Sequence, residues 1–306
     1  MCEEIENTSL AHLREFVDTE LSSMVENVAA NYESNMEGRE LNPFLHFNNV
    51  DITKYMALGR SIDSQLGNRV QRIAFYIARV RYGIEFVPNI VSIKTVNDTE
   101  HSVELTMYSV DCDVEISARL NSFNPFKQIV KINKQLTDEQ VRKSLKIRKS
   151  KYADVIRKTL YMFRGVSEET YEYIKSFSEK EFPVDLLLFE SNNNDITRSE
   201  AYEIKMGGNL DTKNASSNAD EVNKLSRVLK FVANSQAYFA TCYGTCSAAV
   251  SDRIIQTLGA DAILNGEQFW AHIIPAGEGG FTYAQFIEAF QRSFSASGLE
   301  ERIHTL

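Results

Sequence analysis

Proline and glycine are scarce in this chain of 306 residues, which contains 5 Pro and 14 Gly. Collagen-like and low-complexity sequences are rich in these residues, so both classes are excluded. The uncharged stretch 231–251 contains Asn, Gln, Ser and Thr side chains that disfavour a membrane helix. The N-terminal residues MCEEIENTSL are acidic and lack the apolar core of a signal peptide. We therefore expect a globular protein of the cytoplasm, with no membrane partner.

Cysteine is also scarce, with four residues at Cys2, Cys112, Cys242 and Cys246. The last two are separated by only three residues, and no His or further Cys lies near them in sequence. This spacing favours buried free thiols over a zinc site, which fits a reducing compartment.

Positive charge is in deficit overall, since 33 Lys and Arg face 42 Asp and Glu, giving a net charge of −9. The acidic balance argues mildly against a nucleic-acid-binding protein. However, the segment 127–158 holds eleven basic and three acidic residues, so its net charge is +8 and the remainder carries −17. One basic face could therefore meet a polyanion such as DNA.

Hydrophobic spacing indicates helices over residues 5–35 and about 62–82, so region 1–85 is predicted to be mainly helical. Residues 86–118 show strand patterns, and a capping box at Thr137 predicts one basic helix running to about residue 163. A helix from Ser167 to about residue 177 follows. The chain contains no repeat or linker, so one domain over 1–306 is expected, of the α/β (α+β) class.

The most informative part lies between residues 165 and 245. Apolar strand 182–190, an Asn-rich turn at 191–195 and strand 200–206 predict a hairpin. A helix at about 217–233 and a strand at 237–244 follow. The end is predicted to be helical over 250–258, 267–274 and 282–296.

Three charged residues of the predicted hairpin could carry chemistry. Asp185 interrupts an apolar run, while Glu203 and Lys205 lie on one face of the second strand because side chains alternate. Two adjacent carboxylates repel each other unless a cation lies between them. Mg²⁺ binds such oxygen ligands, and the carbonyl of Ile204 could provide a third. Lys205 could then orient a water and offset charge at a phosphate. The alternative is a solvated Glu-x-Lys pair on a surface strand.

These residues resemble a known family. Pro183-Val184-Asp185 followed by Glu203-Ile204-Lys205 is similar to the PD-(D/E)xK nuclease signature, although Val184 separates the proline from the aspartate. The segments GRSIDSQLGNRVQRIAFYIA (59–78), EIKMGGNLDTKNA (203–215) and, weakly, GEQFW (266–270) resemble type II restriction endonucleases.

The resemblance implies a mixed central sheet flanked by helices, an N-terminal helical region and a catalytic core at 165–245. It also implies that Asp185 and Glu203 ligate Mg²⁺ and that Lys205 serves the attacking water. The expected activity is cleavage of double-stranded DNA at a short palindrome, leaving 5′-phosphate ends. A homodimer in a restriction–modification system is expected, with no nucleotide cofactor.

DNA contacts are predicted at two places. Lys213 and Asn214 follow the catalytic strand, where a solvated loop is equally compatible with the sequence. The basic helix would contact phosphates through Arg142, Lys146, Arg148 and Lys149, unless it is merely a solvated face. Gly207 and Gly208 could allow a phosphate to approach the backbone, or could simply form a turn.

Two other functions remain open. A DNA repair or junction nuclease with the same core would cut by structure rather than by sequence. A non-catalytic DNA-binding protein would carry the Glu-x-Lys pair without using it.

Overall fold

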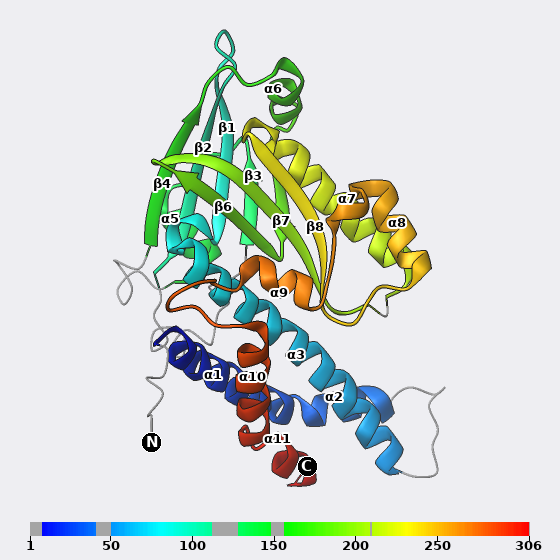
Figure 1. The fold of residues 1–306 in the computed structure, drawn as a ribbon. Coiled ribbons are helices and arrows are strands. Elements are labelled where there is room, and N and C mark those ends of the chain that lie inside the picture. The colour runs from blue at the N-terminus through cyan, green and yellow to red at the C-terminus, as the bar shows by residue number, and fades with distance from the viewer. Residues whose placement is uncertain (1–7, 41–49, 112–127, 148–155, 209, 306) are drawn as a thin grey trace. The chain divides into compact units, whose positions relative to one another are not determined.

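The structure is a computed structural model that describes residues 8–40, 50–111, 128–147, 156–208 and 210–305 (Figure 1). The chain divides into two compact units. One comprises Met1–Ile73 with Ala276–Leu306, and the other comprises Ala74–Pro275. Among the described helices, none is both long and apolar enough to cross a membrane.

The first unit is helical in its described residues. It contains α1 (Thr8–Ala30), α2 (Tyr32–Glu40), the first part of α3 (Val50–Tyr82), α10 (Tyr283–Ala296) and α11 (Leu299–Thr305). Apolar residues recur at helical spacing along α1 and are buried: Leu10, Leu13, Phe16, Val17, Leu21, Met24 and Val28. The prediction of a helical N-terminus is therefore confirmed.

The second unit contains a five-stranded mixed sheet. Its strands are β1 (Ile90–Asn97), β2 (Ser102–Val110), β3 (Gln128–Ile132), β4 (Ile156–Phe163) and β5 (Lys180–Val184). Their order is β4-β2-β1-β3-β5, and β1 and β3 are parallel while the other pairs are antiparallel. The unit also contains η1 (Ile84–Phe86), α5 (Asp138–Ser144) and α6 (Glu168–Lys175).

The basic helix predicted from Thr137 to about residue 163 is wrong over most of its length. The capping box at Thr137 is present, but the helix that it starts, α5, ends at Ser144. Residues 156–163 form the edge strand β4, antiparallel to β2. From Lys158 onward, exposed and half-buried side chains alternate along β4, which is the period of a strand rather than of a helix.

A second mixed sheet contains the predicted hairpin. It consists of β6 (Leu186–Asn192), β7 (Asp195–Gly207), β8 (Asn234–Tyr243) and β9 (Ile263–Asn265), in that order. β6 and β7 are antiparallel, whereas β7, β8 and β9 are parallel. The helices of this part are α7 (Thr212–Val228), η2 (Leu229–Phe231), α8 (Ala248–Leu258), η3 (Ala260–Ala262) and α9 (Glu267–Ile273). The single central sheet of the prediction is therefore replaced by two mixed sheets flanked by helices.

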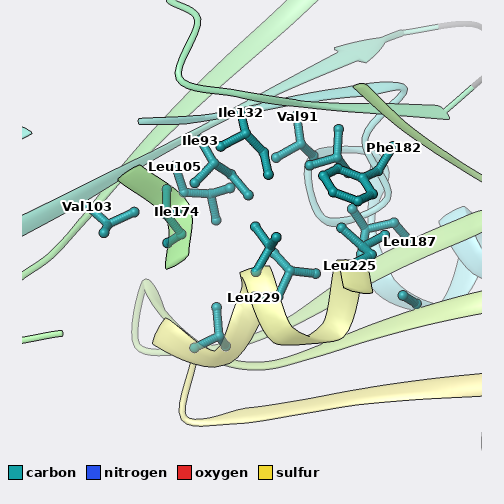
Figure 2. Packing of buried hydrophobic residues seen from close by; sticks show 14 of the residues in the cluster. Val91, Ile93, Val103, Leu105, Ile132, Ile174, Phe182, Leu187, Leu225 and Leu229 are labelled. Atoms are coloured by element: carbon teal, nitrogen blue, oxygen red, sulfur yellow. The ribbon is translucent and has the colours of Figure 1, made fainter. Parts of the chain in front are cut away.

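One apolar cluster joins the two sheets and α7. Figure 2 shows Val91, Ile93 and Leu105 of the five-stranded sheet facing Leu225 of α7, with Leu187 of β6 beside them. The opposite face of the five-stranded sheet packs against Val141 of α5 and Leu145 at its C-terminal cap. α7 thus lies inside the interface between the layers, while α5 lies on the other side of the five-stranded sheet. Burial of these apolar faces is the main force that holds the layers together.

Candidate active site

A tight turn sets the register of the β6–β7 hairpin. Asn193 and Asn194 have φ of 51° and 70°, and Asn192 pairs with Asp195 across them. Two consecutive residues with positive φ match the type I′ turn, for which Asn is well suited. This register brings Leu186 opposite Tyr202, so the residues just beyond that pair, Asp185 and Glu203, lie next to each other.

The chain bends at Asp185, between β5 of one sheet and β6 of the other. Its Oδ2 accepts a hydrogen bond of 2.8 Å from the backbone N–H of Ile204. The carboxylate therefore takes the place of a carbonyl in the ladder at the end of the hairpin. This contact fixes Asp185 against β7, and the predicted meeting of the two strands at this point is what the structure shows.

Glu203 and Lys205 form an ion pair on the face of β7 that also carries Ala201. Lys205 Nζ lies 2.5 Å from Glu203 Oε1, and the two side chains are 27% and 15% exposed. Ala201 belongs to the apolar cluster between the layers, so the pair continues that face toward the end of the strand. The ammonium is thus held beside one carboxylate while remaining open to solvent.

Burial and, to a smaller extent, the neighbouring Glu203 carboxylate raise the pKa of Asp185 to about 7. The Ile204 N–H and the Lys205 ammonium act in the opposite direction. The Asp185 and Glu203 carboxylates lie next to each other, so their negative charges repel unless a cation lies between them. The single Lys205 ammonium offsets this repulsion only in part. The site is therefore electrostatically suited to a divalent cation.

The donor set fits Mg²⁺ better than a softer metal. Two carboxylates are hard oxygen ligands, and Mg²⁺ is often bound by only one or two of them, with waters and a phosphate completing the shell. Within the described ranges, no group of three or more His, Cys, Asp or Glu side chains could enclose a metal ion. The N–H of Ile204 is bonded to Asp185, and the use of its carbonyl as a ligand stays a prediction.

A further carboxylate on β7, Glu200, is directed to the opposite face and does not complete the site. It is buried, forms an ion pair with Arg198 and accepts a hydrogen bond from the hydroxyl of Tyr202. Since side chains alternate along a strand, Glu200 and Tyr202 share one face and Glu203 and Lys205 the other. Only Asp185 and Glu203 are therefore assigned as the acidic groups of the site.

Gln128 is a residue that the sequence analysis missed. It lies opposite Val184 in the β3–β5 ladder, one residue from Asp185, and is 2% exposed. Neither side-chain polar atom has a hydrogen-bond partner among the residues that the structure describes. Such an amide next to the site marks a place that favours a water or another polar group. A polar residue directly before the apolar pair Ile129 and Val130 is the signal that could have found it.

Lys213 and Asn214 lie in the first turn of α7, where Asp211 caps the helix by accepting from the Asn214 backbone N–H at 2.9 Å. The Asn214 side chain also donates to Asp211, whereas Lys213 is exposed. Ala215 packs against Phe239, which is the register partner of Glu203 on β8. The start of α7 therefore lies on the same face as the three charged groups. α7 begins at Thr212 rather than near residue 217 as predicted.

The other predicted DNA contacts are not brought to this face. Arg142 and Lys146 lie in and just after α5, on the far side of the five-stranded sheet. Arg148 and Lys149 lie outside the described residues. The basic segment is partly neutralised, because Lys131, Lys134 and Arg157 pair with carboxylates from elsewhere in the chain. The positive charge of the segment is therefore offset at these three residues.

Cys242 and Cys246 are free thiols, as predicted. Cys242 is buried in β8, and burial raises the pKa of its thiol to about 12, with a smaller effect from the Asp185 charge. A thiol of this kind is protonated at neutral pH and is a poor nucleophile or metal ligand.

Comparisons with protein-family models, curated proteins and solved structures give no match for this chain. The feature of the molecule that bears on function is the site itself, in which two carboxylates and an ammonium are held together where the two sheets meet.

Proposed function

We propose that this protein is a Mg²⁺-dependent, site-specific deoxyribonuclease of the type II restriction endonuclease kind. The observation that carries the proposal is the convergence of Asp185, Glu203 and Lys205 at the end of one hairpin. Each of the three has a role in hydrolysis of a phosphodiester. The resemblance of these residues to the PD-(D/E)xK signature supports the same function.

The chemistry follows from the properties of the three side chains. Asp185 and Glu203 would hold Mg²⁺, which would supply a Lewis acid for the scissile phosphate. Lys205 is close enough to Glu203 to be oriented by it, and its exposed end can hold a water and offset charge that develops on the phosphate. The water oxygen forms a bond to phosphorus in line with the leaving O3′. The P–O3′ bond breaks, leaving a 5′-phosphate and a 3′-hydroxyl.

The start of α7 supports binding of a phosphate chain at this face. Lys213 adds an exposed positive charge in the first turn of this helix, whose N-terminus is already capped by the Asp211 carboxylate. Double-stranded DNA is therefore the proposed substrate. A homodimer is proposed because a two-fold symmetric enzyme can cut both strands of a palindrome.

The test is digestion of plasmid DNA with Mg²⁺, together with three substitutions. Asp185→Asn, Glu203→Gln and Lys205→Ala should each lower the cleavage rate by at least ~100-fold, the scale typical of removing one electrostatic group. Binding of the duplex in Ca²⁺ should remain detectable. The matched exposed controls are Asp220→Asn, Glu221→Gln and Lys230→Ala, which should cut like the wild type.

The pattern of cutting separates the alternatives. Discrete fragments from plasmid DNA support site-specific cleavage, whereas smears or cutting confined to branched DNA support a repair or junction nuclease with the same core. Duplex binding without any Mg²⁺-dependent cutting would show a non-catalytic DNA-binding protein. Unchanged cleavage by Lys205→Ala would remove the catalytic assignment.

A further inference from the structure

Tyr243 is an exposed aromatic residue next to the candidate active site. It is the last residue of β8 and is 61% exposed, although the five residues before it in the strand are buried. An aromatic ring left in solvent forgoes the large stabilisation that burial would provide. The position of this ring therefore invites a functional explanation.

The close contact of Tyr243 with Gly207 fixes the direction of the ring. A Cβ atom at Gly207 would lie 2.9 Å from Cζ and 3.0 Å from the hydroxyl oxygen of Tyr243. The ring thus occupies the space in which a side chain at position 207 would lie. Because side chains alternate along β7, this space is on the face of Glu203 and Lys205. Register agrees, since Lys205 pairs with Thr241 and Gly207 with Tyr243.

The three groups therefore form one row along the end of β7. Alternate positions of a strand are about 6.6 Å apart along the backbone, so the phenol, which fills the side-chain space at position 207, comes next in the row after Lys205. The order of the row is carboxylate, ammonium and phenol. If the first two act on one phosphate, the phenol meets the next sugar and phosphate of the same polynucleotide strand.

Neighbouring backbone contacts hold Tyr243 in place. Trp270 Nε1 donates to the carbonyl oxygen of Cys242 at 2.9 Å, and the Thr241 hydroxyl donates to the carbonyl of Gly244 at 3.0 Å. A Cβ at Gly208 would be 2.0 Å from the carbonyl oxygen of Thr245, so the backbone segments that follow β7 and β8 are closely packed against each other. A ring on such a rigid support loses little conformational entropy when it binds a ligand.

We propose that Tyr243 is a substrate-positioning residue, whose ring packs on the deoxyribose next to the scissile phosphate and whose hydroxyl donates to the adjoining phosphate. This inference rests on the proposed nuclease function and adds a contact outside the three catalytic groups. An aromatic face suits the apolar side of a sugar, and a hydroxyl suits a phosphate oxygen. Gly207 is required because any larger residue would displace the ring.

The first experiment is a double-mutant cycle on duplex binding in Ca²⁺, measured by fluorescence anisotropy with a DNA fragment that the wild type cuts. Tyr243→Ala should raise Kd by roughly tenfold, the scale of one aromatic stacking contact. Gly207→Ala should raise it similarly by moving the ring, and the double variant should show no further loss. Tyr55→Ala, at a tyrosine that is 63% exposed in α3, is the matched control and should bind like the wild type.

The second experiment tests the hydroxyl. Tyr243→Phe should bind DNA several-fold more weakly than the wild type, and replacing the adjoining phosphate with a neutral methylphosphonate should remove that difference. If the Tyr243 hydroxyl had only a structural role, the difference in Kd between Tyr243→Phe and the wild type would stay the same whichever phosphate is replaced. Thermal unfolding of each variant shows whether the fold is retained, and the double variant relieves the clash that Gly207→Ala alone creates.

The outcomes distinguish the two proposals. Wild-type cleavage that is lost in Lys205→Ala, together with unchanged DNA binding in Tyr243→Ala, overturns the role of Tyr243 and leaves the nuclease proposal intact. If the losses of DNA affinity in Tyr243→Ala and Gly207→Ala add up in the double variant, the role of Tyr243 is overturned as well. A wild type that neither binds nor cuts duplex DNA overturns both.

Discussion

At the scale of single residues, Asp185 combines three properties that are individually unremarkable. It lies at a bend between two sheets, it accepts a backbone hydrogen bond from Ile204, and it faces a second carboxylate at Glu203. An apolar residue could pack at this position, but it could not accept the N–H of Ile204. The energetic penalty of burying this carboxyl is consistent with a functional role, because perturbed acids concentrate at functional sites.

The raised pKa of Asp185 predicts a pH dependence of stability in the absence of metal. The carboxyl titrates at about 7 in the folded chain and near 3.8 when unperturbed. Between these values the folded chain holds a proton that the unfolded chain releases, so raising the pH favours unfolding. The contribution approaches ~1.4 kcal/mol per pH unit and levels off above pH 7.

The measurement is urea unfolding in EDTA between pH 4 and 9, comparing the wild type with Asp185→Asn. The difference in the free energy of unfolding between the two should change with pH through this window. Asp220→Asn, at an exposed position on α7, should follow the wild type. Parallel pH profiles for the wild type and Asp185→Asn would contradict the shift.

At the scale of elements, the β6–β7 hairpin is the device that assembles the site. Its type I′ turn at Asn193 and Asn194 fixes a register in which Asp185 and Glu203 become neighbours. A slip by one residue would turn Glu203 and Lys205 to the opposite face, where Glu200 and Tyr202 now lie. The turn, some distance along the strands from the charged groups, therefore matters for their geometry.

This role predicts a specific effect of substitution in the turn. Asn194→Val places a β-branched residue at φ of 70° and should lower the free energy of unfolding by about 1–2 kcal/mol. Asn194→Gly is the matched control, because glycine adopts positive φ readily and should retain or slightly increase stability. Urea unfolding measures both. Equal stability of the two variants would argue against the positive φ at this position.

At the scale of the whole molecule, basic residues are distributed unevenly over the second unit. The positive groups described at the candidate site are Lys205 of β7 and Lys213 in the first turn of α7. The described basic residues of segment 127–158 lie on or just after β3, α5 and β4, and three of them are paired with carboxylates. With a net charge of −9, the protein would depend on local contacts rather than on its overall field to attract DNA.

This arrangement predicts which charge reversal affects DNA binding more. Lys213→Glu should weaken duplex binding in Ca²⁺ and make the slope of log K against log [salt] shallower by about one, because Lys213 lies on the face of the site. Lys146→Glu should have the smaller effect, since Lys146 follows α5 beyond the five-stranded sheet. Anisotropy titrations at several salt concentrations measure both slopes. A larger effect at Lys146 would place the duplex on the α5 face.

Features that depend on residues close together along the chain could be predicted from the sequence. The Asn-rich turn, the caps at Thr137 and Ser167 and the alternation along 200–206 are local patterns, and the structure contains each of them. The grouping of Asp185, Glu203 and Lys205 followed from the hairpin, because one short turn brings its two strands together. Local patterns suffice where the interacting residues are close along the chain.

The pairing of segments that are far apart along the chain is visible only in the folded structure. The break at Asp185 separates β5 from β6 because β5 pairs with β3, about fifty residues earlier, while β6 pairs with β7. Residues 156–163 become a strand because β2 is available to pair with them. The packing of Tyr243 over Gly207 requires two strands that are joined through α7. Such pairings depend on which surfaces meet in the folded chain, and short-range sequence patterns do not encode these long-range contacts.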